Sequence, residues 1–170
     1  MKIIFFIAST VVIFSTAVIS PASAQGPRGS SFGFGIVLVE PLGGTVKFWT
    51  ASDQAFVGSI GGSYFGNPRL NVDYIWHFDA FNSQIVKLYA GPGLSLGFGQ
   101  GSYYWYYRRG DYFYVRDPGS TGIGIRVMLG LNIIPRRTPM ELFIEAGPLI
   151  GVSPAFGSAF DFGLGVRFYP

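Results

Sequence analysis

The stretch TGIGIRVMLGLNI, residues 121–133, alternates apolar and non-apolar side chains without a break. One face would carry Ile123, Ile125, Val127, Leu129, Leu131 and Ile133, and the other Gly122, Gly124, Arg126, Met128, Gly130 and Asn132. A period of two is typical of a β-strand with two unlike faces. Its length is sufficient for a tilted strand that crosses a lipid bilayer.

The same alternation recurs along the chain. It is clear at residues 70–79, 85–98 and 160–169, and weaker at 32–39, 45–50, 55–65 and 140–151. The connections are rich in Gly, Pro, Asn and Ser, which are turn-forming residues. About eight antiparallel strands result, the smallest number usual in a bacterial outer-membrane barrel.

The composition favours a closed barrel over a soluble domain. Charged residues make up only 12% of the chain and aromatic residues 18%, and there are 25 glycines and no cysteines. The absence of cysteine excludes thiol catalysis and thiolate metal sites. Beyond residue 24 no apolar run is long enough for a membrane helix. An apolar exported chain of this kind can satisfy its backbone in lipid by closing its strands into a ring. A soluble sandwich would be expected to carry more charge on its solvent face.

Residues 1–24 have the pattern of a secretory signal peptide. Lys2 precedes an apolar run, and Pro21-Ala-Ser-Ala24 ends in small residues before Gln25, so cleavage is predicted after Ala24. The alternative is an uncleaved anchor helix. Residues 25–170 then form one barrel domain. Removal of Lys2 lowers the formal net charge from +3 by one, and this weak charge does not indicate a nucleic-acid partner.

Charged side chains gather on the predicted inner face. Four cations and four carboxylates share it: Lys47, Lys87, Arg126 and Arg167 with Asp73, Glu141, Glu145 and Asp161. Charges within a membrane structure are costly unless they are paired. The sequence therefore predicts a neutral network in a narrow lumen, which holds the barrel together rather than transporting or catalysing.

An enzyme or a metal site has little support. His77 is the single histidine, and no serine shares its face of the strand, whereas an acyl hydrolase needs a serine activated by a histidine. We expect His77 to lie near a strand end, within reach of Asp73 or Asp79. Because one histidine with scattered carboxylates gives no ligand spacing, no metal, cofactor or catalytic residue is predicted.

The longest connection contains SYYWYYRRGDYFYV, residues 102–115. Its β-forming residues predict a hairpin, with residues 108–111 as the turn. The candidate binding residues are Tyr103, Tyr104, Trp105, Tyr106, Tyr107, Arg108, Arg109, Tyr112, Phe113 and Tyr114. Aromatic rings beside arginines suit lipopolysaccharide, a glycan or a protein partner, although some of these rings would belong to the interfacial girdle. The Arg-Gly-Asp tripeptide has a plain explanation as a turn.

The last strand resembles the C-terminal signal that outer-membrane barrels present to their assembly machinery. Asp161, Gly163, Val166 and Phe168 match that signal, and Tyr169-Pro170 extends beyond it. Residues 33–41, 73–78, 89–93, 140–148 and 160–168 resemble a family of small barrels of unknown function related to the OmpA-like transmembrane domain. The resemblance implies an eight-stranded up-and-down barrel with periplasmic termini, and it implies no activity.

The predicted function is that of a non-catalytic outer-membrane barrel in envelope structure or surface interaction. Its partners would be outer-membrane lipids, lipopolysaccharide and the barrel assembly machinery, with a possible surface protein or glycan on the aromatic hairpin. Two alternatives remain open, namely a lipid-A-modifying or lipid-binding barrel that uses His77 and the lumen carboxylates, and a narrow pore.

Overall fold

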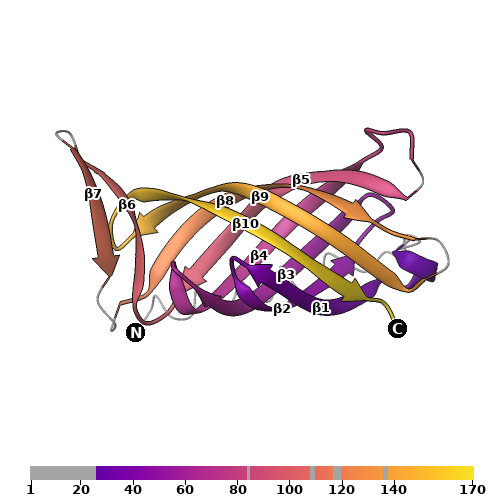
Figure 1. Cartoon of the computed structure of the whole chain (residues 1–170), viewed down its shortest axis with the longest axis horizontal. Coiled ribbons are helices and arrows are strands. Elements are labelled where there is room, and N and C mark those ends of the chain that lie inside the picture. Colours follow the sequence, from indigo (N-terminus) through magenta and orange to yellow (C-terminus); the bar gives the residue numbers. More distant parts are fainter. Residues whose placement is uncertain (1–25, 84, 108–109, 117–119, 136–137) are drawn as a thin grey trace, which may run out of the picture.

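The chain folds into a closed antiparallel β-barrel of eight strands, seen in a computed structural model (Figure 1). The structure describes residues 26–83, 85–107, 110–116, 120–135 and 138–170, with the side chains at 28, 103–107 and 110–116 excepted. The predicted signal peptide lies outside these residues. Within them, no helix has the length and apolar character needed to cross a membrane.

The barrel strands occur in chain order around the ring. They are β1 (Phe32–Val39), β2 (Leu42–Trp49), β3 (Gln54–Ser63), β4 (Gly66–Phe78), β5 (Val86–Gly97), β8 (Gly122–Ile133), β9 (Met140–Ser153) and β10 (Gly157–Phe168). Pairing of β1 with β10 closes the ring, with Phe34 opposite Phe168 and Val39 opposite Gly163. The prediction of an eight-stranded antiparallel barrel is confirmed.

A separate hairpin, β6 (Gly101–Tyr107) and β7 (Gly110–Arg116), stands at one end of the barrel (Figure 1). It joins the sheet where Tyr104 pairs with Ser158 of β10, and the Ser102 N–H donates to the Tyr64 carbonyl. We call this the hairpin end. The other, C-terminal end carries the β4–β5 loop, the chain terminus and the short 3-10 helix η1 (Pro27–Gly29).

Two strands start earlier than the turn residues predict. Residues 42–44 belong to β2, because Gly43 and Gly44 pair with β1 and β3 on either side. Residues 66–69, which separate the alternating runs at 55–65 and 70–79, are also part of a strand, since β4 begins at Gly66 and Arg69 pairs with both Gly61 and Gly97. Tight two-residue connections at Glu40-Pro41 and Tyr64-Phe65 replace the longer turns.

Glycine on the inner face makes the barrel narrow enough to be filled by side chains. A Cβ at Gly35 would overlap the carbonyl oxygen of Val166 on the neighbouring strand. A Cβ at Gly130 would overlap the ring of Tyr89, which lies across the lumen at that position. Small residues thus alternate with long ones, as the interior of an eight-stranded barrel requires.

Candidate functional site

The lumen contains a buried network of charged side chains and is the candidate functional site. Four cations and four carboxylates within the described residues point inward: Lys47, Arg69, Arg126 and Arg167 with Asp73, Glu141, Glu145 and Asp161. None of them is more than 6% exposed. An equal number of opposite charges allows this interior to be desolvated without a net charge.

Asp161 on β10 is the centre of the network toward the hairpin end. Its carboxylate accepts hydrogen bonds from Arg69 at 2.9 and 2.5 Å, from Arg126 at 3.2 Å and from the Tyr64 hydroxyl at 2.6 Å. Arg126 also donates two hydrogen bonds to Asp73, from Nε at 2.6 Å and from Nη2. Arg126 therefore links the two carboxylates. A planar guanidinium makes such bidentate contacts well.

Neutral polar groups complete the hydrogen bonding of Arg69. Its Nε donates to the Asn71 side-chain oxygen at 2.7 Å, and Nη2 donates to the Ser95 hydroxyl at 3.0 Å. The Asn71 amide in turn donates to the Ser59 hydroxyl at 3.0 Å. All three side chains are buried. Buried charges are tolerated when their remaining donors find partners in this way.

Glu141 on β9 holds the other half of the network, toward the C-terminal end. Its carboxylate accepts hydrogen bonds from Lys47 Nζ at 3.0 Å, from Arg167 Nη1 at 2.8 Å and from the Tyr169 hydroxyl at 2.5 Å. Glu145 is the second inward-facing residue after Glu141 on β9. It accepts a hydrogen bond from the Tyr89 hydroxyl at 2.7 Å. One carboxylate thus bridges two cations from β2 and β10.

Aromatic side chains close the C-terminal end above this half. Trp49 and Tyr169 are each 1% exposed, and the Trp49 Nε1–H donates to the Tyr169 hydroxyl at 3.2 Å. The Lys47 ammonium lies 4.2 Å from the centroid of the Trp49 ring, where a cation is attracted by the ring face. Tyr169 is one of the two residues that follow the predicted assembly signal, and its side chain turns back into the lumen.

The β3–β4 connection closes the hairpin end. Phe65 and Leu149 are both fully buried there and form a small apolar cluster with Tyr64, Ala155 and Ala159 around them. Glu40 lies at this end, with Oε2 4.0 Å from Arg69 Nη1. Partial burial raises the pKa of the Glu40 carboxyl, and the positive charge of Arg69 opposes the rise. With both ends closed, the described residues leave the charges inaccessible to solvent.

His77 is held by its surroundings rather than poised for proton transfer. Its Nε2 lies 3.0 Å from Lys47 Nζ, its Nδ1 lies 3.1 Å from the Asp53 carbonyl oxygen, and its ring stacks on Trp49 at a centroid distance of 4.3 Å. Among the described residues, neither Asp73 nor Asp79 is hydrogen-bonded to the His77 ring. Neither ring nitrogen contacts a serine hydroxyl among the described residues, so a hydrolytic pair is not assembled.

Seven of the eight predicted network residues meet in the lumen, and one does not. Lys47, Asp73, Arg126, Glu141, Glu145, Asp161 and Arg167 are buried there. Lys87 instead lies at the C-terminal end, 28% exposed, with Nζ 3.6 Å from Asp79. Arg69 occupies the fourth cationic place in the lumen. The sequence contains a pattern that indicates this position. If the strand predicted at residues 70–79 is extended by one residue toward its start, Arg69, Asn71 and Asp73 share one face at a period of two.

The aromatic hairpin is present as a backbone feature. Tyr103 pairs with Tyr114, Tyr104 with Phe113, Trp105 with Tyr112, and Tyr107 with Gly110. Arg108 and Arg109 lie outside the described residues, as do the side chains of the other predicted binding residues. The turn is tighter than predicted, because Gly110 and Asp111 already belong to β7. The backbone pairing of the hairpin is therefore defined, whereas its role as a binding surface stays a prediction.

No group of three or more histidine, cysteine or acidic side chains in the described part of the chain could hold a metal ion. Comparisons with protein-family models, with curated proteins and with solved structures find no match for this chain. The resemblance to small OmpA-like barrels therefore remains a prediction from the sequence.

Proposed function

We propose that this chain is a non-catalytic integral protein of the bacterial outer membrane, active in envelope structure or surface interaction. The observation that carries the proposal is the apolar outer surface of a barrel that buries four cations and four carboxylates in its lumen. Phe34, Ile60, Val72 and Leu129, on four different strands, are between 48% and 55% exposed. Such side chains continue around the ring on all eight strands.

A belt of this extent is unsuited to water. The largest apolar patch on a soluble monomer covers a few hundred Å², whereas lipid-facing residues of a membrane barrel are apolar over a band that encircles it. The sequence supports the same location through the predicted signal peptide and the assembly signal at residues 161–168. With periplasmic termini, the hairpin end would face outward, and the β6–β7 hairpin would meet lipopolysaccharide, a glycan or a surface protein.

Fractionation with gel mobility tests this proposal. We expect the protein in the outer-membrane fraction, and we expect unheated samples to migrate differently from boiled ones, because a closed barrel in lipid resists detergent. An unshifted band in the soluble periplasmic fraction would overturn the proposal. Deletion of residues 103–115 in the located protein then tests the hairpin. Unchanged surface binding and envelope integrity would remove the role assigned to it.

Leu129→Arg is expected to destabilise the barrel by about 2–4 kcal/mol in lipid vesicles, because it places a charge near the bilayer midplane. Leu129 points outward from the middle of β8 and is 54% exposed. The matched control is Phe81→Arg in the β4–β5 loop, also exposed, for which we expect about 0–1 kcal/mol. The free energy of unfolding in urea with vesicles gives the comparison. Equal effects at the two sites would contradict a membrane location.

The pore alternative has a separate measurement. Because the lumen charges are paired and no more than 6% exposed, we expect no steady conductance from the protein in planar bilayers at 0 to 100 mV. The control is the same preparation heated to unfold it, which distinguishes channel events from detergent leakage. Reproducible single-channel steps in the intact protein alone would favour the pore.

A further inference from the structure

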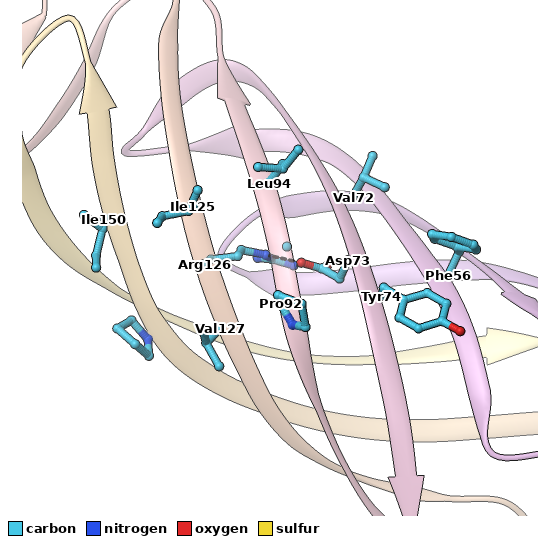
Figure 2. Close-up of a pocket in the computed structure, with 12 residues that line it drawn as sticks. Phe56, Val72, Asp73, Tyr74, Pro92, Leu94, Ile125, Arg126, Val127 and Ile150 are labelled. Carbon is cyan, nitrogen blue, oxygen red and sulfur yellow. Dashed lines mark hydrogen bonds and ion pairs between the residues drawn. The ribbon is translucent and has the colours of Figure 1, made fainter. Parts of the chain in front are cut away.

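A groove of about 470 Å³ indents the outer surface of the barrel across β3, β4, β5, β8 and β9 (Figure 2). Its lining is almost entirely apolar, and its volume is that of a typical ligand pocket. It differs from the lumen site described above because it opens outward, through the apolar belt. Figure 2 shows Asp73 and Arg126 directed toward each other, with the apolar side chains of the groove around them.

Short side chains at one height of the sheet produce the groove. Pro92 of β5 pairs with Val127 of β8, and Pro148 of β9 pairs with Phe160 of β10. In the adjacent row, Leu94 pairs with Ile125, and Ile125 pairs with Ile150. These three aliphatic side chains form the rim of the groove. Phe56 and Tyr74, whose ring centroids are 4.7 Å apart, bound the end on β3 and β4.

The floor keeps its shape because it is built on proline. The β4–β5 pairing stops at Asp73–Gly93 and resumes at Trp76–Ala90, and the β8–β9 pairing stops at Arg126–Leu149 and resumes at Leu129–Ala146. Pro92 and Pro148 lie within these two interruptions. Proline donates no backbone hydrogen bond and its ring has little freedom. A concave surface that exists before binding loses little entropy when it is filled.

The height of the groove on the barrel indicates what kind of molecule can occupy it. Pro92 is the seventh of the twelve residues of β5, and Val127 is the sixth of the twelve of β8, so the floor lies at mid-height of the barrel. In a bilayer this is the level of the hydrocarbon chains. A headgroup or a soluble ligand does not reach it. A second barrel would present a convex surface, which would touch the rim and leave the floor empty.

We propose that this groove binds one acyl chain of a membrane lipid and retains it in preference to the rest of the apolar belt. The inference rests on the membrane location proposed above. Lipid tails are as apolar as leucine, so the preference comes from the additional van der Waals contacts of a chain that lies in a groove rather than on a convex surface. The expected enrichment is therefore modest, about threefold over other lipid-facing positions.

Photocrosslinking tests this site. The intact protein is reconstituted into vesicles of phosphatidylethanolamine and phosphatidylglycerol, with a phosphatidylethanolamine that carries a diazirine at the middle of one acyl chain. Adducts are then mapped by mass spectrometry. We expect adducts at Tyr74, Leu94 and Val127 to exceed those at Leu38, Ile144 and Leu164 by about threefold. Val127→Trp, which fills the groove, should abolish the excess, and Leu164→Trp, on the apolar face of β10, should leave it unchanged.

Each other outcome has a distinct meaning. Even labelling around the belt, or an excess that survives both Val127→Trp and Leu94→Trp, would overturn the acyl-chain proposal while leaving the membrane location intact. An excess at the groove that disappears as the protein density in the vesicles rises would assign the groove to a second copy instead. Absence of any acyl-chain adduct in a folded protein would show that the barrel does not enter the bilayer, and would overturn the proposed function itself.

Discussion

Asp161→Ala should be the most damaging single substitution in the lumen, lowering the free energy of unfolding by about 3–5 kcal/mol. The carboxylate of Asp161 receives hydrogen bonds from two guanidinium groups and one phenol. Its removal leaves Arg69 with only the Glu40 carboxylate, 4.0 Å away, and Arg126 with Asp73 alone. Arginine does not lose its proton inside a protein, so the uncompensated charge stays buried.

The measurement for Asp161→Ala is urea unfolding in lipid vesicles, followed by tryptophan fluorescence. The matched control is Asp79→Ala, which removes an aspartate from the exposed pair with Lys87 and should cost no more than about 1 kcal/mol. Asp161→Asn keeps the size of the side chain and should lie between the two. A loss of stability for Asp161→Ala no greater than that for Asp79→Ala would mean that the network contributes little to the fold.

Glu141→Gln should be the second most damaging change, with a cost of about 2–4 kcal/mol. The loss of this carboxylate leaves the charges of Lys47 and Arg167 facing each other. The effect should be smaller than that of Asp161→Ala for a chemical reason. A buried lysine can give up its proton and become neutral, whereas an arginine cannot.

A double-mutant cycle separates the Lys47–Glu141 pair from its surroundings. Lys47→Met and Glu141→Gln are each expected to destabilise the barrel, and the double variant should be more stable than their sum predicts by about 0.5–3 kcal/mol. Unfolding in urea with vesicles is again the measurement. The control cycle joins Lys47→Met with Asp79→Ala, two side chains that are not paired, and should be additive. Additivity in both cycles would contradict a direct interaction between Lys47 and Glu141.

The sequence predicts the barrel well because each strand has two unlike faces. A shift of one residue would turn the whole apolar set of residues 123–133 into the lumen, and this fixes the register locally. The inward placement of Asp73, Arg126 and Asp161 follows from that register alone. The identity of each ion pair does not follow from the register, because its two partners lie far apart in the chain. Arg69 and Asp161, for example, are 92 residues apart.

The errors arose at strand ends, where alternation gives no information. Lys87 has the inward parity but lies one residue inside β5, where the barrel ends and the side chain reaches water. Arg69 lies just before the alternating run at residues 70–79, yet β4 starts at Gly66. Tyr169 follows the last strand, and only the three-dimensional structure shows its ring above Glu141. The groove could not be foreseen either, since it depends on which side chains of β4, β5, β8 and β9 come to lie beside one another.

The place of β10 as the last strand of the barrel, paired with the first, has a consequence for the order in which the barrel forms. Asp161 and Arg167 belong to β10, and they complete the pairing of cations and carboxylates contributed by β2, β4, β8 and β9. Until that strand is in place, Arg69 lacks its hydrogen-bonded pairing with Asp161, and Glu141 lacks one of its two cations. A sheet that lacks β10 would therefore hold unbalanced charge in its interior, where an unpaired charge is costly. The last strand is therefore needed before the interior of the barrel is electrically balanced, whatever medium surrounds it.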